Sequence, residues 1–241
     1  MDYESLLELF KGRRSIRRFK PDSIPDEYVG KIIEAARWAP SGFNTQPWEF
    51  MVVRKREIRE RIVELVDKYA SHCPGIEDIR EPWLRDKLAP QPYEMSWTNA
   101  PVFIILFGDT RTKGGLPMRA RVEYYREQWL FVSSLANAFL HMHLAATTLG
   151  LASQWVSAVK DPWVNSMLRE LFKAPREWEA FDMMPVGYPD EKPRPKFMRD
   201  PEGMVHHDVC KEEDIRPDED IHDFVRKTRT WVISRARKAG K

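Results

Sequence analysis

The stretch Arg13-Arg14-Ser15-Ile16-Arg17-Arg18-Phe19 puts four arginines and a hydroxyl group into one short turn. It directly follows a helix predicted over residues 3–10, which Gly12 stops in the way that a C-terminal glycine does. Guanidinium groups bond phosphate oxygens in pairs, so this turn suits a compact anion. An arginine pair alone more commonly marks a solvated surface. A second stretch, further along the chain, is what favours a binding site here.

That second stretch is Ala39-Pro40-Ser41-Gly42-Phe43-Asn44-Thr45-Gln46-Pro47-Trp48, a turn-rich loop with small residues and two side-chain amides. Helical spacing predicts one helix between the two stretches, and we expect this helix to bring them together. From Trp48 to Val53 the sequence is apolar and rich in residues that favour strands.

In this order, the arginine turn, the helix, the loop and the strand resemble the opening of the FMN-dependent nitroreductase superfamily. Later matches are Leu149-Gly150-Leu151, then Met184 to Pro189, then a basic segment ending near Arg199. The resemblance covers about residues 5–208. It implies a mixed central sheet flanked by helices, and an intertwined homodimer with two flavins at the subunit interface.

The resemblance also implies a set of FMN-binding residues. FMN carries a doubly charged phosphate, a ribityl chain and a flat ring whose N1 side becomes negative on reduction. In the arginine turn, Arg13 and Ser15 are expected at the phosphate and Arg17 at the ribityl or N1 side, with Arg14 in the same turn. Late in the chain, Arg199 is expected to close on the phosphate. Lys196 competes for that role because the local match has a one-residue gap.

Two further segments complete the expected cofactor site. One is the loop that, in this family, meets the flavin of the partner subunit, and the other passes the ring near N5, where a backbone N–H would donate. The residues matched are Pro40, Ser41, Gly42 and Asn44 in the first segment, and Gln154, Val156 and Ser157 in the second. Trp48 and Trp155 are better explained as packing residues.

Composition limits the classes of partner. The 241 residues are 42% hydrophobic and 32% charged, and the net charge is +2, so no bulk field draws the chain to nucleic acid or an anionic membrane. Two cysteines do not make a disulfide framework. An acidic amino end without an apolar signal region, and no apolar run near the roughly 20 residues of a membrane span, favour a cytoplasmic protein without a membrane partner.

Helices mixed with four or five strands predict an α+β fold in a single domain over residues 1–241. Residues 71–99 carry four prolines and several aromatics, which predicts a lid-like insertion. Residues 204–209 favour a short strand. Residues 210–241 read as a C-terminal extension whose helix packs on the partner subunit.

The implied activity needs no catalytic side chain, because hydride transfer to flavin N5 is cofactor chemistry. Family members work by a ping-pong cycle, in which NAD(P)H reduces FMN and an electron-poor small molecule such as a nitroaromatic or quinone reoxidises it. The rivals are an FMN-dependent reductive dehalogenase-like enzyme and a flavin-binding protein with little turnover. The aromatic residues expected either to wall the open ring face or to pack a lid on its own subunit are Trp83, Tyr93, Trp97, Tyr124 and Tyr125.

Other motifs are absent from the sequence. It contains no G-x-G-x-x-G and no Walker A motif, so no separate dinucleotide domain is indicated. His141 and His143 are two apart on a helix and face different directions, and the cluster His206-His207-Asp208 is short. We therefore expect no metal site.

Overall fold

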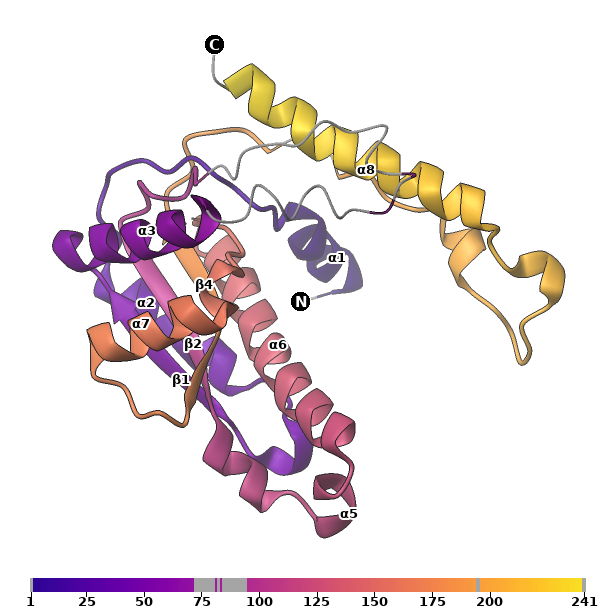
Figure 1. Cartoon of the computed structure of the whole chain (residues 1–241). Coiled ribbons are helices and arrows are strands. Elements are labelled where there is room, and N and C mark those ends of the chain that lie inside the picture. The colour runs from indigo at the N-terminus through magenta and orange to yellow at the C-terminus, as the bar shows by residue number, and fades with distance from the viewer. Residues whose placement is uncertain (1, 72–80, 82, 84–94, 194–195, 240–241) are drawn as a thin grey trace. The chain divides into compact units, whose positions relative to one another are not determined.

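The computed structural model describes residues 2–71, 81, 83, 95–193 and 196–239 (Figure 1). The chain forms two compact units, one of Met1–Tyr69 with Met95–Pro193 and the other of Ala70–Glu94 with Arg194–Lys241. The helices that lie or begin in the first unit are α1 (Tyr3–Gly12), α2 (Asp26–Arg37), α3 (Arg56–Ser71), α5 (Met118–Arg121), α6 (Tyr124–Thr148) and α7 (Pro162–Phe172).

A four-stranded sheet lies at the centre of the first unit, in the order β1-β2-β4-β3. Its three strand pairs are antiparallel, and among the described residues the parallel pairing is the single bridge between Ser15 and Ser153. The strands are β1 (Trp48–Val53), β2 (Val102–Asp109), β3 (Ala152–Ser153) and β4 (Trp178–Gly187). The predicted α+β class is confirmed.

Strand β2 is buried along its whole length, which explains its unbroken apolar sequence. Because successive side chains point to opposite faces, Val102, Ile104 and Leu106 join the core formed with α2 and α6. The intervening Phe103 and Ile105 join a second core with α3 and α7. Figure 1 shows the resulting layers, with helices on both faces of the sheet.

Helix α6 is long and apolar enough to cross a membrane by length and composition, over Tyr125–Thr148. However, 44% of the apolar window is buried inside the protein. The helix covers one face of the sheet, with Leu135, Phe139 and Met142 in the core. We interpret α6 as the core helix that its apolar second half predicts.

The arginine turn of residues 13–19 and the loop of residues 39–48 lie at opposite ends of the sheet. Trp48, which follows the second stretch, pairs with Gly108 near the end of β2. The arginine turn bridges to β3, which pairs with β4 at Val186, and Val186 lies opposite Val102 at the start of β2. Six residues of β2 correspond to about 20 Å. The expectation that α2 brings the two stretches together within one chain is therefore wrong.

The second unit carries the C-terminal helix α8 (Asp218–Ala239), as predicted. Within this unit the ring of Trp83 stacks on His222 with centroids 3.9 Å apart. Residues 204–209 do not form the predicted strand, because the 3-10 helix η5 (Pro201–Met204) takes the start of that segment and the rest is irregular. Most of the predicted lid, Tyr93 included, lies outside the described residues. Trp97, in the first unit, is fully buried in the core.

Replacing Gly108 with alanine should destabilise the first unit. A Cβ at this position would lie 2.4 Å from Phe131 Cζ and 2.6 Å from Leu135 Cδ1, and both side chains belong to the packed core. We expect a loss of about 1–3 kcal/mol in the free energy of unfolding, measured by urea denaturation. Gly30→Ala is the control, because a Cβ there meets nothing within 4 Å. It should be neutral or stabilising in its helix. Equal stability of the two variants would contradict the packing at Gly108.

Candidate active site

The arginine turn is fastened to the end of the sheet by backbone contacts. Ile16 N–H donates to Ser153 O at 3.1 Å, next to the parallel bridge of Ser15 with Ser153. Further on, Lys20 N–H donates to Tyr188 O at 2.9 Å, just past the end of β4. The turn therefore follows the edge of the sheet and leads directly to the segment after β3. Two of the sequence-predicted pieces of the site, residues 13–17 and 154–157, are adjacent in the structure.

Arg13 is a half-buried cation in this turn that has no polar partner among the described residues. Its guanidinium makes neither a hydrogen bond nor an ion pair with any of them. Burial, with the charge of Arg14 beside it, lowers the pKa of Arg13. Arg14 donates instead to the carbonyl oxygens of Lys11 and Arg13. A bound anion would relieve both the desolvation of Arg13 and the repulsion between the two arginines.

An acid also lies at the turn. The backbone N–H of Arg17 donates to Glu191 Oε1 at 2.8 Å, just beyond β4. This contact uses the main chain of Arg17 and helps to fix the path of the turn. It therefore strengthens the frame that presents Arg13.

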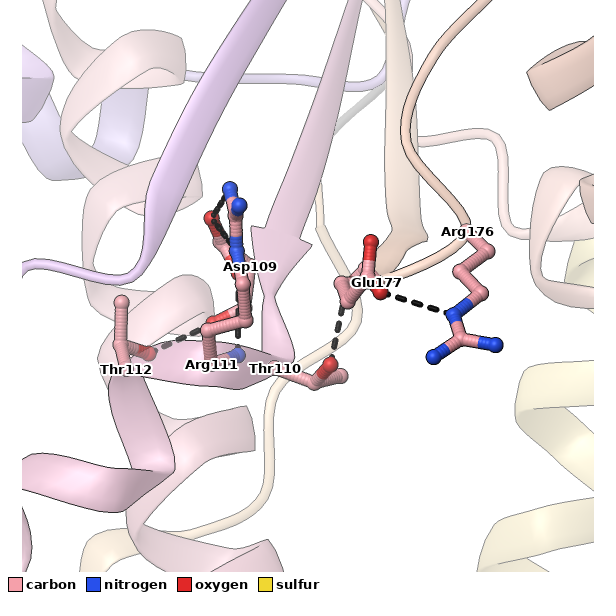
Figure 2. Close-up of polar contacts among 6 residues, drawn as sticks. All are labelled: Asp109, Thr110, Arg111, Thr112, Arg176 and Glu177. Carbon is pink, nitrogen blue, oxygen red and sulfur yellow. Dashed lines mark hydrogen bonds and ion pairs between the residues drawn. The ribbon is translucent and has the colours of Figure 1, made fainter.

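Two ion pairs lie at the opposite end of the sheet, as Figure 2 shows. Arg111 Nε lies 2.9 Å from Asp109 Oδ1, and Arg176 Nε lies 2.8 Å from Glu177 Oε1. Arg111 lowers the pKa of Asp109, and Arg176 lowers the pKa of Glu177. Thr110 Oγ1 joins the two pairs by donating to Glu177 O at 2.9 Å. The arginines at this end are thus already paired with carboxylates. The arginine turn, at the other end of the sheet, is better suited to bind an added anion.

The segment after β3 lies along β4 as a strap. Gln154 N–H donates to Pro185 O at 3.2 Å, and Val156 N–H donates to Met183 O at 3.0 Å. The amides of Trp155 and Ser157 alternate with these and have no backbone acceptor in the described part of the chain. The carboxamide oxygen of Gln154 is buried, without a hydrogen-bond partner there. An amide donor to a ligand would thus come from Trp155 or Ser157.

A buried histidine supports this strap from α6. His143 is 1% exposed, and its Nδ1 lies 2.7 Å from Ser153 Oγ. Its ring stacks on Trp155 at 5.6 Å. Burial, with the positive charge of Arg13 nearby, lowers the pKa of His143 to about 3, so the ring is neutral at physiological pH.

The predicted partner-facing loop packs on the first half of α6. Gly42 N–H donates to Ser134 Oγ at 3.0 Å, and a Cβ on Gly42 would lie 3.2 Å from Leu130 Cδ2, so a larger residue there would have to displace the Leu130 side chain slightly. Pro40 O accepts from Asn137 Nδ2 at 3.1 Å. Asn44 has a φ of 54°, a conformation that asparagine tolerates, and it is exposed. Ser41 Oγ accepts from the N–H of Gln46 at 3.1 Å.

The predicted late arginine belongs to the second unit. Arg199 Nη2 donates to Gly203 O at 2.7 Å, within the turn that contains η5. Lys196 is exposed in the same unit. Whether Arg199 or Lys196 reaches the phosphate stays a prediction.

Sequence reasoning missed the polar groups under the strap. Asp182 is fully buried on β4, and Lys160 Nζ lies 3.0 Å from its Oδ2. The available signal was the carboxylate of Asp182 inside the otherwise apolar stretch from Phe181 to Val186. His143 was considered only as half of a metal pair. His141 instead bonds the carbonyl of Ala35, and the described residues contain no group of three metal ligands.

The buried neutral His143 predicts a stability that falls on acidification. The unfolded chain takes up a proton near the ordinary histidine pKa of about 6.5, whereas the folded chain does so only near pH 3. Stability should therefore drop by about 2 kcal/mol from about pH 7.5 to about pH 5. Urea denaturation at a series of pH values would measure it. His143→Phe should flatten this dependence, and His206→Gln, at an exposed site in the second unit, should retain it. Matching slopes in His143→Phe and the unmodified protein would contradict the assignment.

Known proteins resemble this chain in sequence and in fold. The sequence profile of the Nitroreductase family matches residues 10–188. A Methanothermobacter thermautotrophicus protein, provisionally named NADH dehydrogenase/NAD(P)H nitroreductase, is 30% identical over 197 residues, 82% of this chain and 84% of that protein. The iodotyrosine deiodinase of Thermotoga neapolitana is 29% identical over 206 residues, 80% of this chain and 93% of that one. The match to pig iodotyrosine deiodinase 1, at 28% identity, spans 78% of this chain and only 63% of the enzyme.

Solved structures agree on the fold. The FMN-dependent nitroreductase from Clostridium difficile R20291 superimposes with a TM-score of 0.61 at 23% identity, covering 85% of this chain and 99% of that one. Nitroreductase CinD from Lactococcus lactis gives a TM-score of 0.66 at 17% identity, covering 86% and 100%. Together with the arginine turn and the loop on α6, these matches show that the chain is an oxidoreductase that belongs to the nitroreductase family.

Proposed function

We propose that the protein is an FMN-dependent oxidoreductase of the cytoplasm that passes electrons from NAD(P)H to an electron-poor small molecule. The observation that carries this proposal is Arg13, a half-buried cation that meets no counterion among the described residues and is held next to the strap of residues 154–157. FMN requires such a pairing, with a cation at its phosphate and amide donors along its ring. The C. difficile relative is described as FMN-dependent.

The residues present fit the cofactor. Arg13 and Ser15 would hold the phosphate, and Arg17 would lie toward the ribityl or N1 side. The amides of Trp155 or Ser157 would face the ring edge, because those of Gln154 and Val156 are bonded to β4. When bound, FMN supplies the hydride chemistry in alternate reduction and oxidation. The chain binds and orients it, and leaves one ring face open to the donor and then to the acceptor.

A second copy of the chain would complete the site. Within one chain the arginine turn and the Pro40–Asn44 loop are fixed to opposite ends of the sheet, about 20 Å apart along the strands. Helix α6 also presents an exposed apolar stripe, which continues from α5. We propose that this stripe packs against a second copy, whose loop reaches the flavin of the first. Its exposed members are Met118, Val122, Tyr125, Trp129, Val132 and Leu140.

A reductive dehalogenase is the second candidate function. It is favoured by the iodotyrosine deiodinases among the similar proteins, one of which matches over 93% of its length. The two activities use the same arginine turn and loop. They differ in the group that covers the open ring face, which the resemblance assigns to residues 71–99.

Stopped-flow mixing tests the activity directly. The FMN-loaded protein should be bleached by NADH or NADPH and reoxidised by a nitroaromatic or a quinone. Reoxidation by iodotyrosine with iodide release, and none by nitroaromatics or quinones, would favour the dehalogenase. Arg13→Ala should weaken FMN binding at least tenfold, because a charge-assisted hydrogen bond contributes about 1.5–3 kcal/mol. FMN fluorescence quenching measures this affinity.

The control for Arg13→Ala is Lys11→Ala, which removes a cation from α1 that is already paired with Glu8. Its FMN affinity should match that of the unmodified protein. If Arg13→Ala binds FMN as tightly as Lys11→Ala, Arg13 does not hold the phosphate. A protein that binds no FMN at all would overturn the proposed function.

Trp129→Glu should break the proposed dimer. Trp129 is 70% exposed in one chain, and a carboxylate in the middle of an apolar interface would be desolvated without a partner. We expect sedimentation to show a monomer and FMN affinity to fall at least tenfold. Trp163→Glu, on α7 at the other face of the sheet, makes the same chemical change and should leave the dimer intact. A dimer that persists in Trp129→Glu would place the interface elsewhere.

A further inference from the structure

A buried ion pair lies under the strap of residues 154–157, and neither of its members is among the residues proposed to contact the cofactor. Asp182 is fully buried on β4, and Lys160 Nζ lies 3.0 Å from its Oδ2. Neither carboxylate oxygen receives a hydrogen bond of good geometry from the described residues. A carboxylate buried with so few donors is costly, so the fold retains an energetically unfavourable charge at this position.

The backbone of β4 is irregular next to Asp182. The register between β2 and β4 shifts at this point, with Leu106 opposite Asp182 and Phe107 opposite Ala180. Phe181 is the extra residue of this irregularity, and Lys160 Nζ lies 4.5 Å from the centroid of its ring. The lysine is thus held between an acid and an aromatic face, and its 44% exposure keeps it in contact with solvent.

Backbone hydrogen bonds connect the segments that carry Lys160 and Asp182 to the strap. Lys160 closes the 3-10 turn η4 (Ala158–Lys160), and its N–H donates to Ser157 O at 3.0 Å. Val156 and Met183 exchange two backbone hydrogen bonds of 3.0 Å, which fix the strap one residue from Asp182. Burial raises the pKa of Asp182, and Lys160 with the side chains of Ser157 and Trp155 opposes that rise. The carboxylate therefore lies against the two residues whose amides are available to a ligand.

We infer that the Asp182–Lys160 pair is an electrostatic tuning device, through which the strap sets the reduction potential of the bound flavin. The inference rests on the proposed function, because it places the flavin ring on the strap. Reduction adds negative charge to the ring, so a nearby carboxylate disfavours the reduced form and a nearby ammonium favours it. In the intact pair the two effects oppose each other. Neither residue is assigned a contact with the flavin. Both act on it from beneath the strap that would carry the ring, so we class them as positioning residues.

Single substitutions should unbalance the pair in opposite directions. Asp182→Asn leaves the Lys160 charge unopposed, so the midpoint potential of bound FMN should become more positive. Lys160→Gln leaves the carboxylate unopposed, so at about pH 8 the midpoint potential should become more negative. The double variant should return close to the unmodified value. Spectroelectrochemical titration of the FMN-loaded protein measures all three.

A merely structural role would not produce opposite signs. Arg56→Gln is the control for charge, because it removes one cation that is paired with Glu60 within its own helix α3. Its potential should equal that of the unmodified protein. Shifts of the same sign in Asp182→Asn and Lys160→Gln, or no shift in either, would overturn the inference.

Two outcomes keep the inference separate from the proposed function. If the unmodified protein binds no FMN, the proposed function fails first. If FMN binds normally and the potentials do not move, only the tuning role fails. Should Asp182→Asn not fold, Lys160→Gln decides alone, since Lys160 is partly exposed and its replacement removes no buried side chain. An unchanged potential in that variant, with FMN bound, would then refute the role.

Discussion

The bridge between Ser15 and Ser153 is the constraint on which the candidate site depends. Strand β3 has only two residues, and it is the edge of the sheet, so its free side offers unpaired backbone groups. The arginine turn occupies that side, with Ile16 N–H on Ser153 O at 3.1 Å. An edge that would otherwise be open to another chain is thereby covered by the turn that presents Arg13. One backbone contact both closes the sheet and positions the cation.

The length of the sheet sets the second constraint. The turn and the Pro40–Asn44 loop are fixed to opposite ends of strands whose pairing is specified residue by residue. No loop movement within a chain can close a gap of about 20 Å while those pairings persist. The exposed apolar stripe along α6 agrees with the proposed second copy, since such a surface commonly marks an interface. The proposal of a site shared between two copies rests on this separation and on that stripe.

Much of this fold could be predicted from local sequence. The apolar run of β2 and the periodicity of α6 depend on neighbouring residues alone, so the local sequence is enough to indicate both elements. The positions of the two motifs relative to each other could not, because they depend on how β1, β2 and β4 pair.

Within the site, the adjacency of residues 13–17 and 154–157 follows from the family resemblance. The His143–Ser153 contact and the Asp182–Lys160 pair depend on how α6 and the strap meet β4, which no local pattern encodes.

The paired charges at the far end of the sheet have a consequence for how a ligand approaches. Asp109 with Arg111, and Glu177 with Arg176, form compact dipoles whose fields cancel within a few ångströms. Arg13 and Arg14 have no such counterion among the described residues, so the arginine turn contributes more than these pairs to the long-range attraction of a dianion. Added salt would slow the capture of such a molecule mainly by screening the turn, while its rate of departure would change little.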